Sequence, residues 1–196
     1  MKLNEIFDRV VVINLDERTD RMEEFDRQAK EIGLEYIRYS AVKANPPQLR
    51  PTDACKQSHV NVIQQAVDDG VQRLFVFEDD AQFVLDFERK LNGFLSKLHP
   101  KWDMMYLGAW IHQSEPVAEG VVRLLDSYSA HAYGINTEFM ELALASAKHR
   151  NTPIDIALSM THPRINAYCA KPALVRQAPG YSDIEKEYRD VTDKYL

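Results

Sequence analysis

Cysteine is scarce in this sequence, and long apolar runs are absent. The 196 residues include two cysteines, Cys55 and Cys169, which lie far apart and form no CxxC pair. This number and spacing argue against a disulfide framework and a zinc knuckle, so we expect two reduced core thiols in a cytoplasmic protein. No apolar stretch approaches the about 20 residues that span a bilayer, and the first residues carry mixed charges. Neither a membrane span nor a signal peptide is expected.

An excess of positive charge is also missing. The chain has 24 Lys and Arg against 30 Asp and Glu, which gives a net charge of −6. A protein that mainly neutralises phosphate backbones needs the opposite sign, so a nucleic acid is not the expected partner. The one proline-rich interruption, residues 44–51, is interpreted as an ordered surface loop. With 45% hydrophobic residues, the length suits a single domain over residues 1–196.

Strand-like and helix-like segments alternate over the first hundred residues. Residues 10–13 form a β-branched run typical of a buried strand, and apolar residues at helical spacing follow from Thr19 until Gly33. The alternation predicts an α/β fold with a mostly parallel central sheet flanked by helices. The other predicted strands are 36–39, 74–77, 104–107, 121–125, 130–135 and 166–170, and the other predicted helices are 54–69, 87–98, 137–148 and a short one beginning at Thr152-Pro153.

Three acids, Glu78, Asp79 and Asp80, directly follow the most apolar short segment of the chain, residues 74–77. In an open α/β sheet, ligands bind beyond the carboxyl ends of the strands, so the acids occupy a functional position. Adjacent carboxylates repel one another, and a hard divalent cation such as Mg²⁺ or Mn²⁺ relieves this repulsion. Because alternate residues of an extended segment point the same way, we expect Glu78 and Asp80 to face the ligand while Asp79 points elsewhere. A solvated turn with a helix cap is the alternative.

Three segments, in order, resemble glycosyltransferase family 25, the group that contains bacterial lipooligosaccharide (lipopolysaccharide biosynthesis) galactosyltransferases and collagen galactosyltransferases. The first is residues 12–21, Val-Ile-Asn-Leu-Asp-Glu-Arg-Thr-Asp-Arg. The second joins residues 54–59, Ala-Cys-Lys-Gln-Ser-His, to residues 75–81, Phe-Val-Phe-Glu-Asp-Asp-Ala. The third is residues 131–135, His-Ala-Tyr-Gly-Ile, with Pro-Ile-Asp downstream at residues 153–155. Together the segments span most of the chain. They depart from the family pattern at Ala54, where the family has glycine.

The resemblance implies a GT-A-type nucleotide-sugar transferase fold and a UDP-sugar donor. Glu78 and Asp80 would hold Mn²⁺ or Mg²⁺, which acts as a Lewis acid on the departing diphosphate. The donor-binding part would comprise about residues 1–110, and the acceptor and catalytic part about residues 111–196. The implied donor-binding residues are Asn14, Arg18, Arg21, Ser58, Glu78, Asp79, Asp80, His131 and Tyr133.

Several of these residues have a structural alternative. Arg18 and Arg21 suit phosphate oxygens because a guanidinium binds them bidentately, but they also suit a solvated first helical turn. Ser58 and His59 are expected near a helix start, where free backbone N–H groups can meet a phosphate; helix capping and core packing are their alternatives. The strand at residues 131–135 can equally belong to the core.

An inverting transfer needs a base that removes the proton of the acceptor hydroxyl as this hydroxyl attacks the sugar. Asp155 is the predicted base. It is expected in a first helical turn, where the helix dipole favours an acid for structural reasons as well. Glu115 and Asp183 are the reserve candidates.

The predicted activity is metal-dependent transfer of a hexose from a UDP-sugar to a hydroxyl group of a glycan or a protein. A metal-dependent phosphohydrolase or nucleotidyltransferase also places carboxylates at strand ends around Mg²⁺, but it leaves the segments 14–21 and 58–59 unexplained. A non-catalytic nucleotide-sugar-binding module is the third possibility, because the part available for an acceptor is short.

Overall fold

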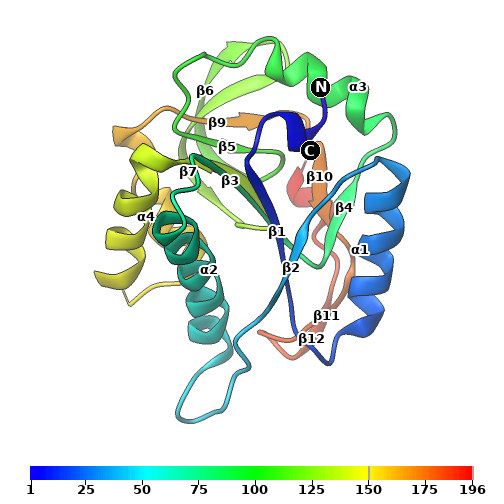
Figure 1. The fold of residues 1–196 in the computed structure, drawn as a ribbon, viewed down its shortest axis with the longest axis vertical. Coiled ribbons are helices and arrows are strands. Elements are labelled where there is room, and N and C mark those ends of the chain that lie inside the picture. Colours follow the sequence, from blue (N-terminus) through cyan, green and yellow to red (C-terminus); the bar gives the residue numbers. More distant parts are fainter. Residues whose placement is uncertain (150, 196) are drawn as a thin grey trace.

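The computed structural model describes residues 1–149 and 151–195. Its centre is an eight-stranded sheet (Figure 1). Every strand predicted from the sequence belongs to it, and one further strand, β6, was not predicted because most of its residues are exposed. In spatial order the strands are β2 (Ile37–Ser40), β1 (Arg9–Asn14), β3 (Arg73–Glu78), β8 (Ala132–Asn136), β5 (Met104–Tyr106), β9 (Ala167–Ala170), β7 (Val121–Tyr128) and β6 (Trp110–Ala118).

The sheet is mixed, which corrects the prediction of a mostly parallel sheet. Among the described residues, three of its seven strand pairings are parallel and four are antiparallel. Long crossovers keep β2, β1 and β3 parallel, whereas β6 and β7 are joined at Gly120 by a turn so tight that they pair antiparallel. Strand β8 runs against both of its neighbours, β3 and β5. The beginning of β8 and the end of β3 therefore lie at the same edge of the sheet.

Helices cover both faces of this sheet (Figure 1). A hydrophobic core lies on each face of the sheet, and alternate side chains of β3 pack into both. Leu74 and Val76 pack into one core, and Phe75 and Phe77 pack into the other. The helices α1 (Thr19–Glu31) and α3 (Phe87–Leu95) pack on the side of the two phenylalanines, and α2 (Pro51–Asp68), α4 (Thr137–His149) and α5 (Ile154–Ser159) pack on the other side.

The predicted helix boundaries are largely confirmed. Gly33 and Gly70 follow α1 and α2 with φ values of 61° and 71°, a left-handed conformation that ends a helix without steric cost in glycine. Helix α2 begins at Pro51, three residues earlier than predicted, because a proline at the first position loses no hydrogen bond. Helix α5 carries Asp155 in its first turn, as predicted.

Two small antiparallel sheets bring the C-terminal segment to the carboxyl edge of the large sheet. Strand β4 (Ala81–Phe83) pairs with β10 (Val175–Gln177), and β11 (Gly180–Ser182) pairs with β12 (Glu187–Arg189). None of these strands was predicted, since three residues are too few to show a periodic pattern. Figure 1 shows β11 and β12 close to β1 and α1. The short 3-10 helices are η1 (Leu3–Glu5), η2 (His162–Arg164) and η3 (Thr192–Tyr195).

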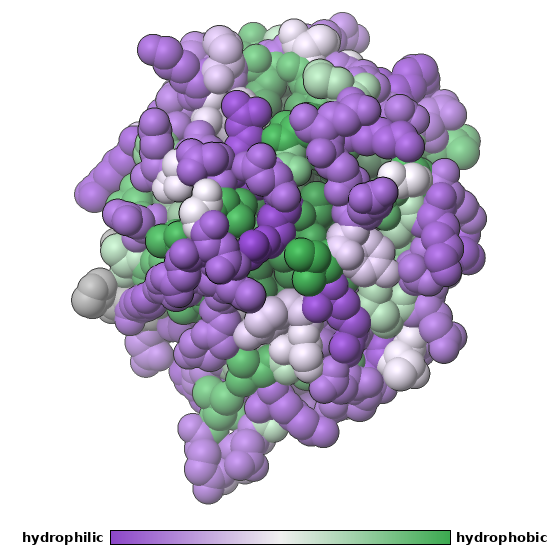
Figure 2. All heavy atoms as spheres, viewed as in Figure 1, coloured by the Kyte–Doolittle hydropathy of each residue, from purple (hydrophilic) through white to green (hydrophobic). Residues whose placement is uncertain are grey.

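Hydrophilic residues dominate the face of the molecule shown in Figure 2, with smaller hydrophobic areas between them. Among the residues that the structure describes, no helix is both long enough and apolar enough to cross a bilayer.

Candidate active site

The three acids lie where the sequence predicted them, at the carboxyl end of β3. Glu78 is the last residue of the strand, and its backbone N–H donates to the carbonyl of His131, just before β8. Asp79 and Asp80 form the turn into β4. Because the extended conformation ends at Glu78, the expected alternation is wrong: Asp79 and Asp80 both contact the guanidinium of Arg21, at 2.9 Å and 3.5 Å, while Glu78 turns to His59.

Asp79 is anchored by side chains from the first βα unit. Its Oδ2 accepts a hydrogen bond of 2.7 Å from the buried amide of Asn14, and its Oδ1 accepts one of 2.9 Å from Arg21. The carbonyl oxygen of that amide accepts from Nε of Arg38, so both ends of Asn14 are engaged. Burial raises the pKa of Asp79 in spite of these partners. Asn14 therefore has a positioning role in this structure.

Asp80 is less fully compensated, although its Oδ2 lies 3.5 Å from the guanidinium of Arg21. Its Oδ2 lies 3.5 Å from Nε2 of Gln177, and its Oδ1 is buried with no hydrogen-bond partner among the described residues. Burial, followed by the charge of Glu78, raises the pKa of Asp80 to about 7. A buried carboxylate oxygen without a donor is expensive in free energy unless a proton or a cation binds it. Asp80 is thus the acid of this cluster that most needs a cation.

Glu78 belongs to a second set of contacts, on the side of α2. Its Oε1 lies 3.1 Å from Nε2 of His59, whose Nδ1 lies 3.1 Å from the hydroxyl of Tyr133. Burial tends to raise the pKa of Glu78, but the hydrogen bond with His59 brings it below its ordinary value. Cys55 lies one helical turn before His59, and its Sγ completes a group of potential ligand atoms that all lie within 4.8 Å of one another. Cys55 is therefore only half-buried and part of a polar cluster, whereas Cys169 is the buried thiol that the sequence predicted.

Ser58 does not lie at a helix start. It occupies the third turn of α2, fully buried, where its hydroxyl donates to the carbonyl of Ala54 and accepts from the backbone N–H of Val42. At this depth in a helix the backbone N–H groups are already paired, so the argument from free donors does not apply. The expectation failed because α2 begins at Pro51. Ser58 ties α2 to the segment that follows β2.

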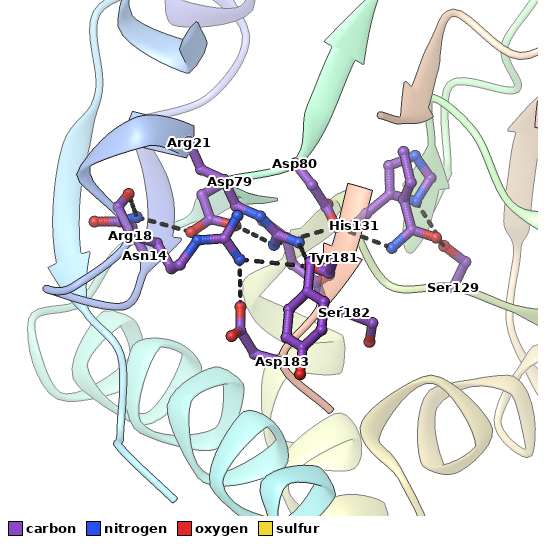
Figure 3. A network of polar contacts seen from close by, with 12 residues as sticks. Asn14, Arg18, Arg21, Asp79, Asp80, Ser129, His131, Tyr181, Ser182 and Asp183 are labelled. Carbon is purple, nitrogen blue, oxygen red and sulfur yellow. Dashed lines mark hydrogen bonds and ion pairs between the residues drawn. The ribbon is translucent and has the colours of Figure 1, made fainter. Parts of the chain in front are cut away.

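The arginines Arg18 and Arg21 point into the polar centre, not into solvent (Figure 3). Arg18 makes two hydrogen bonds of 2.9 Å to Asp20 and an ion pair with Asp183. Arg21 reaches Asp79, Asp80 and, at 2.8 Å, the carbonyl of Tyr181. The guanidinium of Arg21 bridges the acids of β3 and the β11–β12 hairpin, and that of Arg18 contacts the same hairpin, so neither is a freely solvated side chain of a first helical turn.

His131 and Tyr133 are completely buried. Nε2 of His131 donates to the carbonyl of Val175, and its Nδ1 lies 2.7 Å from the hydroxyl of Ser129. Burial lowers the pKa of His131 to about 4, so the ring is neutral at pH 7. Neither side chain is accessible to a ligand. Each is linked to the acids through other side chains: Tyr133 through His59, and His131 through Ser129 and Gln177.

The candidate bases lie in different surroundings. Both carboxylate oxygens of Asp155 accept backbone hydrogen bonds, from Ser129 at 3.1 Å and from Ile156 at 2.9 Å. Asp183 follows β11 and pairs with Arg18. Glu115 lies on the exposed edge strand β6 and pairs with Arg123 at 3.2 Å, away from the acids of β3 in sheet order. The structure thus leaves Asp155 and Asp183 near the polar centre and separates Glu115 from it.

A family profile identifies the chain. The profile of glycosyltransferase family 25, described as an LPS biosynthesis protein family, matches residues 50–168, more than half of the sequence. The chain belongs to glycosyltransferase family 25. The matched region contains the acids of β3, Ser58 and Asp155, while Arg18 and Arg21 precede it.

Individual relatives include active and inactive proteins. Procollagen galactosyltransferase 1 of Danio rerio is 28% identical over 145 residues, which cover 60% of this chain and 24% of the relative. Procollagen galactosyltransferase 2 of Mus musculus is 25% identical over 233 residues, covering 91% of this chain and 37% of the relative. Inactive glycosyltransferase 25 family member 3 of Mus musculus is 28% identical over 156 residues, covering 67% and 26%. This family 25 chain therefore corresponds to a minor part of each relative's length.

Solved structures agree on the fold. A glycosyltransferase involved in glycosylation of the major capsid of PBCV-1 has a TM-score of 0.55 at 13% identity, covering 91% of this chain and 95% of that one. A197 from STIV has a TM-score of 0.50 at 11% identity, covering 92% of each chain. At such low identity the similarity concerns the fold alone, a mixed α/β fold of the GT-A-like kind.

The residues of this family 25 member fit a metal ion in two ways. Oδ1 of Asp80, buried and unpaired, offers the hard oxygen that Mg²⁺ and Mn²⁺ prefer. Cys55, His59 and Glu78 form a possible metal site with sulfur, nitrogen and oxygen ligands. Glu78 belongs to the second set and is two residues from Asp80 in the sequence.

The sequence prediction gave no role to Ser129, Gln177 and Tyr195, which join in one hydrogen-bonded group. Oε1 of Gln177 accepts from the hydroxyl of Tyr195 at 2.9 Å and lies 3.0 Å from the hydroxyl of Ser129, so its amide nitrogen is turned toward Asp80. No local pattern marks these residues, because they come from three separate segments. Only the pairing of β10 with β4 brings Gln177 next to the acids.

Proposed function

We propose that this chain is a metal-dependent glycosyltransferase that moves a hexose from a UDP-sugar to a hydroxyl group of a glycan or a protein, with inversion. The observation that carries the proposal is Asp80. In a family 25 chain, a buried carboxylate with an unpaired oxygen lies at the carboxyl end of a central strand, beside Arg21. This combination suits a site where a cation and a diphosphate bind together.

Asp80 and Glu78 are the proposed ligands of Mn²⁺ or Mg²⁺. When bound, the ion would supply Lewis-acid stabilisation of the charge on the departing diphosphate. Asp79 has a different task in this proposal: its contacts with Asn14 and Arg21 hold the turn and the arginine in place. Gln177 orients Asp80 from the opposite side.

Arg18 and Arg21 are the proposed phosphate ligands. Arg18 holds the carboxylates of Asp20 and Asp183, and Arg21 holds a backbone carbonyl of the hairpin that contains Asp183. A diphosphate carries more negative charge than any one of these partners, and it can take two parallel hydrogen bonds from a guanidinium. Donor binding would therefore replace the contacts of the hairpin with Arg18 and Arg21.

Asp155 is the proposed base that takes the proton of the acceptor hydroxyl, with Asp183 as the alternative. The charge of Asp155 is among those that raise the pKa of Cys55, together with the charges of the acids of β3, so it acts on the same region. Its position in the first turn of α5 and its two backbone hydrogen bonds fix the carboxylate in one orientation.

The test is Mn²⁺-dependent release of UDP from a panel of UDP-hexoses, in wild type and in Asp80→Asn. We expect release in wild type, dependence on Mn²⁺, and loss in the variant. Asp86→Asn is the matched control, because it removes an exposed carboxylate that pairs with Arg89 at 3.1 Å outside the site. Unchanged release in Asp80→Asn would refute the assignment of Asp80.

The same assay separates the two alternatives. A phosphohydrolase that splits the diphosphate would yield UMP and hexose 1-phosphate in place of UDP, and a nucleotidyltransferase would release hexose 1-phosphate as it transfers the uridylyl group. A non-catalytic module, for which the inactive relatives give a precedent, would show a rise in melting temperature with UDP-sugar and Mn²⁺ but would release no product.

A further inference from the structure

Cys55, His59 and Glu78 form a compact group beside the proposed donor site. Cys55 and His59 lie four residues apart on α2, so their side chains project from the same face of the helix. Glu78 meets them from the end of β3. The Sγ, ring nitrogen and carboxylate oxygen that they offer all lie within 4.8 Å of one another.

We propose that these three side chains bind a zinc ion, with Sγ of Cys55, Nε2 of His59 and one carboxylate oxygen of Glu78 as ligands. Zinc favours mixed sulfur, nitrogen and oxygen ligands, whereas Mn²⁺ and Mg²⁺ favour oxygen. A tetrahedral zinc ion with bonds of about 2.0–2.3 Å keeps its ligand atoms roughly 3.3–3.6 Å apart. The observed group needs side-chain movements of only about 1 Å to reach this spacing, and the fourth position stays open.

The surroundings of His59 prepare its ring for this role. The ring is fully buried, its Nδ1 lies 3.1 Å from the hydroxyl of Tyr133, and the two rings stack with centroids 5.8 Å apart. Without a metal, Nε2 donates to the carboxylate of Glu78; zinc binding would break this hydrogen bond and place the ring proton on Nδ1, which would donate to the hydroxyl of Tyr133 and leave Nε2 its lone pair. Metal-binding histidines commonly have such an outer partner, which fixes the orientation of the ring.

The charge balance also favours a cation. Glu78 brings a carboxylate into the group, and the charges of Asp155, Asp80 and Asp79 also act on Cys55. A divalent ion offsets these charges and stabilises the thiolate. Binding would release the thiol proton of Cys55 to solvent, so zinc affinity should rise with pH.

One consequence rests on the proposed function. Glu78 is a proposed ligand of both the zinc ion and the Mn²⁺ ion. When its carboxylate binds zinc, it is no longer available to bind Mn²⁺ at the donor site. Zinc is then expected to inhibit UDP release, and added Mn²⁺ should relieve the inhibition. Inhibition that Mn²⁺ does not relieve would contradict the sharing of Glu78.

The direct test uses Co²⁺ as a spectroscopic substitute for zinc, on the full chain freed of metal. A thiolate ligand gives a charge-transfer band in the near ultraviolet, and a tetrahedral site gives intense visible bands. We expect both in wild type, loss of the charge-transfer band in Cys55→Ser, and its retention in Cys169→Ala, a control at a buried cysteine outside the group. Tyr133→Phe should weaken zinc binding by roughly 10- to 100-fold, measured by competition with a chelator.

Absence of the band in wild type, or its persistence in Cys55→Ser, would overturn the proposal. A second measurement needs no variant. Mass spectrometry of the alkylated wild type should show that zinc protects Cys55 from alkylation. Equal alkylation with and without zinc would refute the site. Neither readout depends on catalysis. If the chain releases no UDP but shows the cobalt band, the proposed function fails and the zinc site stands.

Discussion

The variant Asp80→Asn tests how the protein tolerates a buried carboxylate at the end of β3. Burial and the neighbouring Glu78 raise the pKa of Asp80 from 3.8 to about 7. In the unfolded chain this carboxyl ionises at its ordinary pKa, so in the folded protein its ionised form is disfavoured. Asp80 therefore lowers the stability of the metal-free protein as pH rises above 3.8, and the loss is complete above pH 7. Asparagine keeps the shape of the side chain and removes the charge.

The size of the effect follows from the pKa change. At about 1.4 kcal/mol per unit of pKa, the full loss is about 4 kcal/mol. Roughly 1.6 kcal/mol of it is already present at pH 5, which leaves a change of about 2.5–3 kcal/mol between pH 5 and pH 8. The difference in unfolding free energy, variant minus wild type, should increase by this amount over the same range.

Urea unfolding in the presence of EDTA at pH 5 and pH 8 measures this difference. Asp86→Asn is the matched control, since an exposed ion pair contributes little to stability at either pH. Addition of Mn²⁺ at pH 8 should stabilise wild type and have a smaller effect on Asp80→Asn. A difference that stays flat between pH 5 and pH 8 would refute the reasoning, because it would mean that the folded protein compensates the charge of Asp80.

Three further predictions concern other parts of the molecule. A Cβ on Gly108 would lie 2.0 Å from the carbonyl oxygen of Val175, so Gly108→Ala should cost about 1–3 kcal/mol in urea unfolding; an unchanged stability would show that β10 shifts freely. Asp183→Asn should lower the dissociation constant of UDP in calorimetry, since a neutral side chain competes less for Arg18, and an unchanged or higher constant would contradict this proposed role. Because burial lowers the pKa of His131 from 6.5 to about 4, its neutral ring should stabilise the fold above pH 6.5, and up to about 3 kcal/mol should be lost as pH falls to 4. His131→Gln should lack this loss in acid titrations of stability, and an equal loss in the variant would assign it to other groups.

Periodicity explains which fold predictions succeeded. The buried run of β3 and the apolar spacing of α1 are local patterns, and both elements occur where they were predicted. The direction of β8 is not a local property: it depends on which strands lie beside it, and this choice made the sheet mixed. The hairpin β11–β12 consists of strands too short for a pattern, so it went unpredicted.

The family and the place of the acids follow from the chain alone, because Glu78, Asp79 and Asp80 directly follow an apolar strand and each neighbouring motif is a contiguous segment. The contacts of each acid depend on the fold. Asp79 meets Asn14 across 65 residues of sequence, and Asp80 meets Gln177 across 97. Such contacts arise from strand order and from the end of the extended conformation at Glu78. Three consecutive carboxylates therefore acquire three different sets of partners, with Arg21 common to Asp79 and Asp80, and no spacing rule along the chain encodes these sets.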